Sequence, residues 1–263
     1  RMQTVSHQGR ETAYEVFDRG GDGTPLLCVH GSGGTHAVWK SQARLGDERP
    51  VVALDLAGHG ESEDVDADPG YETLAAYADD VVAVADATDA RILCGNSLGG
   101  AVVMHCLLER GDDLTVDGAV YAGTGAKLAV LSDLRDWLAD DFERAVEWLH
   151  DPGRLFADPE PELVELSKTA MLQCGQRIVE RDFLTSHTFD VRDRLQEIET
   201  PGRAVVGEHD VLTPPRYHDY LASELDDCDV AVVEDAAHLA MLERPDGFNA
   251  ALADFCERID ENQ

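Results

Sequence analysis

The sequence G-N-S-L-G-G at 95–100 places a serine, Ser97, where a predicted strand gives way to a predicted helix. The apolar run before it is typical of a buried strand, and the apolar residues after Leu98 are typical of a helix packed on a sheet. A G-x-S-x-G turn at such a junction holds the serine exposed in a strained conformation. Three common residues at these offsets occur by chance in roughly one chain in ten. The context of the motif therefore makes Ser97 a candidate nucleophile.

A serine nucleophile needs a base that takes its proton and a group that orients this base. The predicted strand at 202–207 runs directly into Asp210, and the apolar run at 230–233 is followed by His238. Each of these side chains then follows the carboxyl end of a strand, as Ser97 does. We therefore predict a triad in which Ser97 attacks, His238 carries the proton and Asp210 orients the imidazole.

Some neighbouring residues leave alternatives open for the acid and the base. Glu208 and His209 adjoin Asp210 and could set that loop differently, while the end of an earlier predicted strand reads G-T-G at 123–125 and holds no carboxylate. His30 and His59 lie in strand-end turns, where a loop-holding role is the simpler interpretation. Of the histidines, His238 follows a strand in the region expected for the base.

Acyl transfer also requires hydrogen-bond donors aimed at the oxyanion of the tetrahedral intermediate. The predicted strand at 26–29 ends in a glycine-rich loop, H-G-S-G-G at 30–34. We predict that the backbone N–H of Ser32 is one donor, with Gly33 as the alternative, and that the N–H of Leu98 is the other. A plain connecting turn or a phosphate-binding loop would also be glycine-rich, but no G-K-[ST] follows this one.

Five motifs occur in one order along the chain: H-G-S-G-G at 30–34, L-D-L-A-G-H-G-E-S at 54–62, G-N-S-L-G-G at 95–100, G-E-H-D-V-L-T-P at 207–214 and A-H-L-A-M-L-E-R-P at 237–245. Together they resemble the α/β-hydrolase superfamily in its serine esterase and lipase-like branch. The resemblance implies the chain order serine, acid, histidine, which matches Ser97, Asp210 and His238. Ala237 replaces a common glycine and Asn96 a common bulky residue, and neither change removes a catalytic group. A serine nucleophile argues against dehalogenases and epoxide hydrolases of this fold, which use aspartate.

The remaining pattern predicts an α/β fold with a doubly wound, mostly parallel sheet. Short apolar runs are typical of strands and alternate with segments of helical periodicity, such as 73–87. From 126 to 199 the pattern is helical with no convincing strand, and the resemblance implies a cap over the active site. We therefore predict a core formed by 1–125 and 200–263 and an inserted helical cap at 126–199. Most of the cap's aromatic residues are expected to pack the cap rather than line a pocket.

The charge of the chain is unusual. Its 263 residues include 53 acidic and 21 basic ones, which gives a formal net charge of −32, and acidic pairs such as Asp112-Asp113 and Asp226-Asp227 are spread along it. Such a field repels nucleic acids and anionic membranes. Acidic composition with few lysines resembles proteins of salt-in halophiles, in which high salt screens self-repulsion. An ordinary acidic enzyme is the alternative.

The six cysteines form no C-x-x-C pair, and several fall in predicted core elements, which favours reduced buried thiols over disulfides or zinc ligands.

No run of 18 apolar residues and no signal-like start occur, so we expect a cytoplasmic protein. We expect no cofactor, no metal, no nucleic-acid partner and no membrane partner, and the oligomeric state stays open.

The function predicted from these residues is that of a serine hydrolase that cleaves a carboxylic ester or related acyl bond through an acyl-enzyme. A thioesterase, a lactonase or a carbon–carbon bond hydrolase of the same fold would use the same residues. A ligand-binding receptor with little turnover is the alternative from a different class. Intact Ser97, Asp210 and His238 favour an enzyme.

Overall fold

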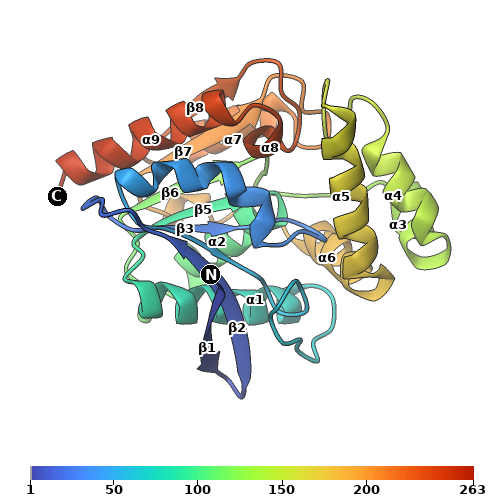
Figure 1. Ribbon diagram of the computed structural model, residues 1–263, viewed down its shortest axis with the longest axis horizontal. Helices are drawn as coiled ribbons and strands as arrows, with labels where there is room; N and C mark the ends of the chain where they lie inside the picture. Colours follow the sequence, from blue (N-terminus) through green and yellow to red (C-terminus); the bar gives the residue numbers. More distant parts are fainter. Residues whose placement is uncertain (1) are drawn as a thin grey trace.

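The computed structural model describes residues 2–263 and is built around one eight-stranded sheet of order β1-β2-β4-β3-β5-β6-β7-β8 (Figure 1). The pairs β1·β2 and β2·β4 are antiparallel, and the other neighbouring strands are parallel. The predicted mostly parallel, doubly wound sheet is therefore confirmed. The strands are β1 (Met2–His7), β2 (Arg10–Phe17), β3 (Leu26–Val29), β4 (Val51–Leu54), β5 (Ile92–Asn96), β6 (Gly118–Ala122), β7 (Gly202–Gly207) and β8 (Cys228–Val233).

Helices cover both faces of the sheet. The helical elements are η1 (His36–Asp47), α1 (Tyr71–Thr88), α2 (Leu98–Glu109), α3 (Ser132–Asp140), α4 (Phe142–His150), α5 (Pro161–Cys174), α6 (Gln176–Thr188), η2 (Leu195–Glu197), α7 (Pro215–Glu224), α8 (Ala240–Glu243) and α9 (Pro245–Glu261). One hydrophobic cluster joins α1, α2 and α7 to one face, and a second joins η1, α8 and α9 to the other. Because both faces are covered, the central strands are buried throughout, as their continuous apolar runs predict.

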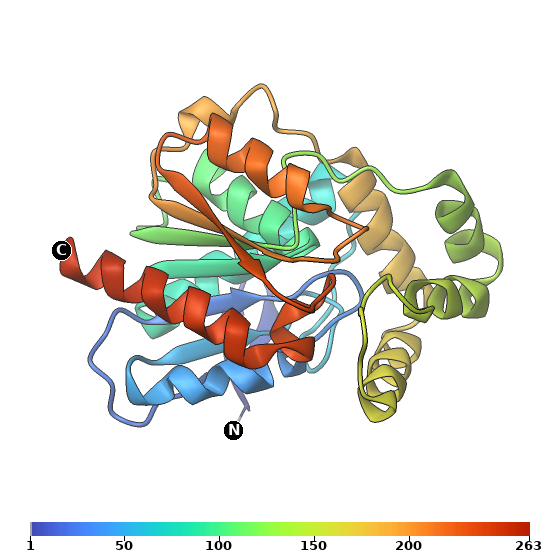
Figure 2. The same ribbon diagram turned by 90° about the horizontal axis from the view of Figure 1, so that it is seen from above.

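Helices α3 to α6 lie between β6 and β7 in the chain and form a group beyond one end of the sheet, as Figure 2 shows from above. They have a hydrophobic cluster of their own, which includes Leu138, Val146, Leu149 and Val179. Leu239 and Leu242, from the loop and helix that follow β8, pack against this cluster. The group is therefore attached to the core beside the segment that carries His238.

Two details of the sheet differ from the prediction. The apolar run at 230–233 predicts a buried strand, but β8 is the edge of the sheet, and Val232 is 54% exposed. An edge strand has a neighbour on one side only, so apolar residues there are left partly uncovered. The alternating sequence at 14–17 predicts a half-exposed strand, which is the end of β2, and the largely polar β1 was not predicted.

The six cysteines are free thiols, and four of them, Cys28, Cys94, Cys106 and Cys256, are buried. Burial raises the pKa of the Cys106 and Cys256 thiols to about 12. Within residues 2–263, no helix is both long and apolar enough to cross a membrane.

Candidate active site

Ser97 connects β5 to α2 with φ 54° and ψ −117°, which is a left-handed conformation that costs a non-glycine residue roughly 1–3 kcal/mol. Two glycines permit this turn by close approach. A Cβ on Gly95 would lie 2.2 Å from the carbonyl oxygen of Gly99, and a Cβ on Gly99 would lie 2.2 Å from that of Val29. The motif at 95–100 therefore brings α2 against β5 and β3 and leaves the Ser97 side chain half-buried, lining a cavity.

His238 and Asp210 form a buried pair, with His238 Nδ1 2.9 Å from Asp210 Oδ2. The same oxygen accepts the hydroxyl of Thr213 at 2.9 Å, and Oδ1 accepts the backbone N–H groups of Leu212 and Thr213. Burial alone would raise the pKa of Asp210, but the charge of His238 and these hydrogen bonds lower it below its ordinary value. Asp210 is thus held as a carboxylate facing the imidazole.

Ser97 and His238 line one cavity of about 1100 Å³, together with the loop at 31–35. Among the hydrogen bonds of residues 2–263, none joins the Ser97 hydroxyl to His238. Such bonds are often long or poorly aligned without substrate and tighten when it binds. The structure therefore places Ser97 and His238 on one cavity, with His238 bonded to Asp210 behind it.

The glycine-rich loop after β3 faces Ser97, and a Cβ added to Gly31 would lie 3.1 Å from the Cβ of Ser97. The Gly33 N–H donates to Asp182 Oδ2 at 2.9 Å and is therefore occupied. In the described part of the chain, neither Ser32 N–H nor Leu98 N–H donates to a protein acceptor. This geometry favours Ser32 over Gly33 as an oxyanion donor.

Helices α3 to α6 supply much of the cavity wall through apolar side chains, among them Leu134, Trp148, Leu163, Met171 and Phe183. Trp148 also packs against Trp137, with ring centroids 6.1 Å apart. Trp148 therefore both lines the cavity and packs the helices, whereas Trp137 lies outside the lining. The opposite wall comes from η1 and from the loops that carry the triad candidates.

Glu243 was not predicted, yet it is 6% exposed and holds the His238 loop. Its carboxylate accepts the N–H of Ala237 at 2.9 Å and those of Ala157 and Asp158 at 2.9 and 2.7 Å. This carboxylate therefore ties the segment after α4 to the residue before His238. The only sequence signal for a role of Glu243 was its place in the motif at 237–245. Its partners Ala157 and Asp158 are too distant in sequence to be predicted.

Three of the other four buried histidines, His30, His59 and His218, have structural contacts close to the central strands. His30 donates from Nδ1 to the Gly31 carbonyl and accepts the Leu56 N–H at Nε2, and burial lowers its pKa to about 4. His218 accepts the Thr124 N–H, and burial lowers its pKa to about 4 as well. The third, His59, bonds to Asp182 at 2.6 Å. Predicted loop-holding roles for His30 and His59 agree with these contacts.

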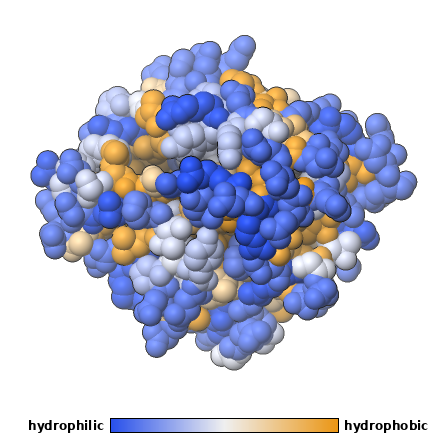
Figure 3. Space-filling model, turned by 180° about the vertical axis from the view of Figure 1, so that it is seen from behind, coloured by the Kyte–Doolittle hydropathy of each residue, from blue (hydrophilic) through white to orange (hydrophobic). Residues whose placement is uncertain are grey.

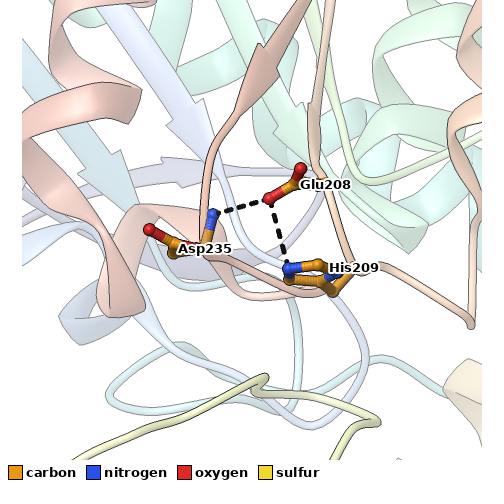
Figure 4. A group of neighbouring side chains, drawn as sticks. All are labelled: Glu208, His209 and Asp235. Atoms are coloured by element: carbon orange, nitrogen blue, oxygen red, sulfur yellow. Dashed lines mark hydrogen bonds and ion pairs between the residues drawn. The ribbon is translucent and has the colours of Figure 1, made fainter.

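Glu208, His209 and Asp235 gather at the ends of β7 and β8, with potential metal-ligand atoms within 4.8 Å of one another (Figure 4). All three are exposed, and Glu208 is already bound to His209 Nε2 at 3.2 Å and to the Asp235 N–H at 3.2 Å. These contacts account for the cluster without a metal. Glu208 contacts His209 rather than His238, whereas Asp210 contacts His238, so the geometry favours Asp210 over Glu208 as the candidate acid.

Comparison with known proteins gives a family match over residues 26–251, to the alpha/beta hydrolase family. A protein of Azorhizobium caulinodans whose name proposes it as a carbamate hydrolase, RutD, is 30% identical over 94% of this chain and 96% of its own length. A pimeloyl-[acyl-carrier protein] methyl ester esterase of Neisseria meningitidis is 28% identical over 89% of this chain and 94% of its own.

Two solved structures resemble the whole fold. A thermophilic esterase superimposes with a TM-score of 0.85 at 25% identity, covering 98% of both chains. Est816, described as an N-acyl homoserine lactone degrading enzyme, superimposes with a TM-score of 0.84 at 26% identity, covering 96% of this chain and all of its own. The fold and its inserted helices are therefore shared with enzymes that act on ester-like bonds.

Proposed function

This chain belongs to the alpha/beta hydrolase family, and from that premise we propose that it is a serine hydrolase that cleaves carboxylic esters through an acyl-enzyme. Ser97 Oγ attacks the ester carbonyl while His238 Nε2 takes its proton. Asp210 holds the imidazole through Nδ1 and stabilises its charged form. The Ser32 and Leu98 N–H groups stabilise the oxyanion.

In the second half of the cycle, His238 gives the proton to the departing alkoxide, which leaves as an alcohol. His238 then takes a proton from water, and the hydroxide attacks the acyl-enzyme carbonyl. Collapse of the second tetrahedral intermediate releases the carboxylic acid and returns the proton to Ser97 Oγ. Every group in this sequence belongs to the chain, to the ester or to water.

One observation carries the proposal. A strained serine at the start of α2 shares a cavity with a histidine whose other ring nitrogen bonds a buried carboxylate at 2.9 Å. A serine in this conformation costs stability, and such strain is kept where a side chain has to be presented in an exposed position. A ligand-binding receptor would need neither the strain nor the histidine–carboxylate pair.

The names of the relatives support ester-like substrates and do not identify the leaving group. The Neisseria relative is named for a methyl ester and Est816 for a lactone, which is a cyclic ester. We propose that helices within 126–199 form a cap domain over the core of 1–125 and 200–263. The apolar cavity wall that α3 to α6 provide is the support for this assignment.

A substrate panel tests the function. p-Nitrophenyl esters of rising chain length, thioesters and lactones would be assayed in high salt with the wild-type chain and with Ser97→Ala. We expect hydrolysis of the oxygen esters by the wild-type chain alone. Turnover of lactones or thioesters over all linear esters would redirect the proposal to those bonds, and turnover of none would contradict it.

We also propose that the chain is adapted to high salt and works in a reducing, intracellular compartment. Its net charge of −32 and the exposed pairs Asp112-Asp113, Asp140-Asp141 and Asp226-Asp227 support the first point, and its free cysteines support the second. Hydrophilic residues dominate the face in Figure 3. Asp80 is one of the few buried acidic residues, and it bonds Arg10, Thr12 and the Ala57 N–H.

We expect the melting temperature to rise steeply between 0.1 and 3 M KCl. The screening length falls from about 10 Å at 0.1 M to about 3 Å at 1 M, so repulsion between surface carboxylates is removed from the folded state. A gain of several kcal/mol corresponds to a rise of about 10 °C or more for a chain of this size. The measurement is thermal unfolding followed by circular dichroism.

A variant with Asp112, Asp113, Asp226 and Asp227 each changed to Asn is the matched control. It removes exposed charge, so it is expected to unfold at a higher temperature in 0.1 M KCl and to depend less on salt. A melting temperature that is flat or falls with KCl in the wild-type chain would overturn the salt adaptation and leave the hydrolase proposal intact.

A further inference from the structure

The cavity beside Ser97 contains no acidic side chain. None of the residues that line it is Asp or Glu, although the chain has 53 of them. The lining is mostly aliphatic and aromatic, and the charged side chains in it are Lys40 and Arg154. The charge of the lining is thus opposite in sign to the net charge of the chain.

The two cations differ in whether they are already paired. Arg154 binds Asp151 at 2.8 Å, donates to the Trp148 carbonyl at 2.8 Å, and has its guanidinium carbon 4.0 Å from the centroid of the Trp148 ring. Lys40, on η1, is exposed, and no ion pair joins it to any residue of 2–263. Its ammonium is therefore the one charged group of the lining that is free to bind an anion.

We propose, on the basis of the serine esterase function above, that the substrate is an apolar ester carrying a negative charge, and that Lys40 binds this charge. A cationic ester entering the cavity would meet apolar walls, a lysine and no carboxylate, so its charge would be desolvated without a partner. A carboxylate on the substrate would find an ammonium that no protein group occupies. Lys40 is thus a specificity-determining residue for substrate charge.

The test uses three p-nitrophenyl esters of similar length: the neutral hexanoate, the anionic adipate monoester and the cationic 6-aminohexanoate. In 1 M KCl the screening length is about 3 Å, so direct contacts rather than the net charge of the chain decide the outcome. We expect kcat/KM for the adipate monoester to exceed that for the 6-aminohexanoate by about 100-fold. Lys40→Met is expected to lower the adipate value about fivefold and to leave hexanoate within twofold.

Lys127→Met is the control, because it removes the same charge from an exposed lysine that does not line the cavity. Equal adipate values for Lys40→Met and wild type, or a preference for the cationic ester, would overturn the inference. If either result were found while hexanoate hydrolysis still depended on Ser97, the proposed esterase function would stand without the role of Lys40. Loss of hydrolysis of all three esters in the wild-type chain would instead contradict the function itself.

A second inference comes from a buried network around Asp182 of α6. One carboxylate oxygen, Oδ2, accepts the Gly33 N–H at 2.9 Å and contacts His59 Nε2 at 2.6 Å, while Oδ1 accepts the Tyr77 hydroxyl at 2.5 Å. Asp182, His59 and Tyr77 are all fully buried. Burial alone would raise the pKa of Asp182, but the charge of His59 and the hydrogen bonds from His59, Tyr77 and Gly33 together lower it below its ordinary value. These contacts therefore favour a carboxylate at Asp182.

We infer that Asp182 is a positioning residue for the oxyanion donor. Gly33 directly follows Ser32, and the bond from its N–H to a carboxylate on α6 fixes the orientation of the peptide groups in this loop. An oxyanion donor acts through its placement, and loss of one donor costs about 10²–10³ in kcat. Asp182 thus links the helices that wall the cavity to the placement of the Ser32 N–H.

Asp182→Asn tests this inference. Once the carboxylate is gone, a neutral His59 that donates from Nδ1 to the Ala57 carbonyl presents Nε2 as an acceptor. The new amide then turns its NH₂ toward His59, and the Gly33 N–H loses its acceptor. We expect kcat to fall about 10- to 100-fold while KM stays within threefold of the wild-type value. An alkylboronic acid forms an adduct with Ser97 that places an oxygen in the oxyanion site. We expect inhibition by this acid to weaken by the same factor as kcat.

Tyr77→Phe is the matched control, because it removes the bond to Oδ1 and leaves both contacts of Oδ2. It is expected to lower stability and to keep kcat within twofold. Asp182→Glu is the second variant, to be used if Asp182→Asn does not fold. It keeps the charge but shifts the carboxylate by about 1 Å, and a displacement of this size can lower the rate by up to 10²-fold. Unchanged kcat in the folded Asp182 variants, or an equal loss in Tyr77→Phe, would overturn the positioning role.

Discussion

Replacing Ser97 by Ala is expected to lower kcat for ester hydrolysis by about 10⁴- to 10⁶-fold, and replacing His238 by Ala is expected to have a similar effect. The members of a triad act as one unit, so loss of either one removes most of the chemical advantage of both. Ser97→Ala also removes only a hydroxyl that lines an existing cavity, so it leaves no new void in the core. The melting temperature is therefore expected to stay close to that of the wild-type chain. Steady-state kinetics with a p-nitrophenyl ester is the measurement.

Ser223→Ala is the control for this experiment. Its hydroxyl is exposed and donates to the Tyr220 carbonyl on α7, outside the cavity lining. Its activity should equal that of the wild-type chain. A Ser97→Ala variant that kept even one tenth of wild-type kcat would show that another group is the nucleophile.

Replacing Asp210 by Asn is expected to lower kcat by about 10³- to 10⁴-fold. An amide can still accept the Leu212 and Thr213 N–H groups through its oxygen, so the loop should keep its shape. Its NH₂, however, would face Nδ1 of His238 and favour the tautomer whose Nε2 carries hydrogen and cannot take the proton of Ser97. In serine proteases, the same Asp to Asn change in the triad lowers kcat by about 10⁴.

Two further variants separate the acid from its neighbours. Asp219→Asn makes the same chemical change on the exposed side of α7 and is expected to leave kcat unchanged. Glu208→Gln addresses the alternative acid, and its kcat is expected to stay within a few-fold of the wild-type value because Glu208 contacts His209 and Asp235. Near-normal turnover in Asp210→Asn with a large loss in Glu208→Gln would reassign the acid.

Much of the fold follows from local sequence patterns. Central strands such as β3 and β4 are short and wholly apolar because both faces of a parallel sheet are covered, and such runs can be recognised without a structure. The turn at Ser97 could be predicted because the glycines it needs lie within four residues. Edge strands could not be assigned in the same way. Whether β8 has a neighbour on its outer side depends on the strand order, and its apolar sequence does not reveal that order.

Part of the candidate site could be predicted from sequence in the same way, and part of it could not. Ser97, Asp210 and His238 each follow the end of a predicted strand, so the parallel sheet itself brings them to one edge. Asp182 and Glu243 hold this site by contacts across 149 and 86 residues of sequence, and Asp182 lies inside a helix with no motif around it. Which carboxylate of a helix is buried against a distant loop depends on tertiary packing. The contacts of these two residues therefore became visible only in the structure.

Labelling with a fluorophosphonate tests the central claim most directly, because this reagent phosphonylates a serine that an adjacent base has activated. We predict one adduct per chain on the peptide that contains Ser97, with loss of esterase activity in proportion to labelling, no adduct in Ser97→Ala and much slower labelling in His238→Ala. A chain that hydrolyses esters while Ser97 stays unlabelled, or that carries the adduct on another residue, would contradict the assignment of Ser97 as the nucleophile.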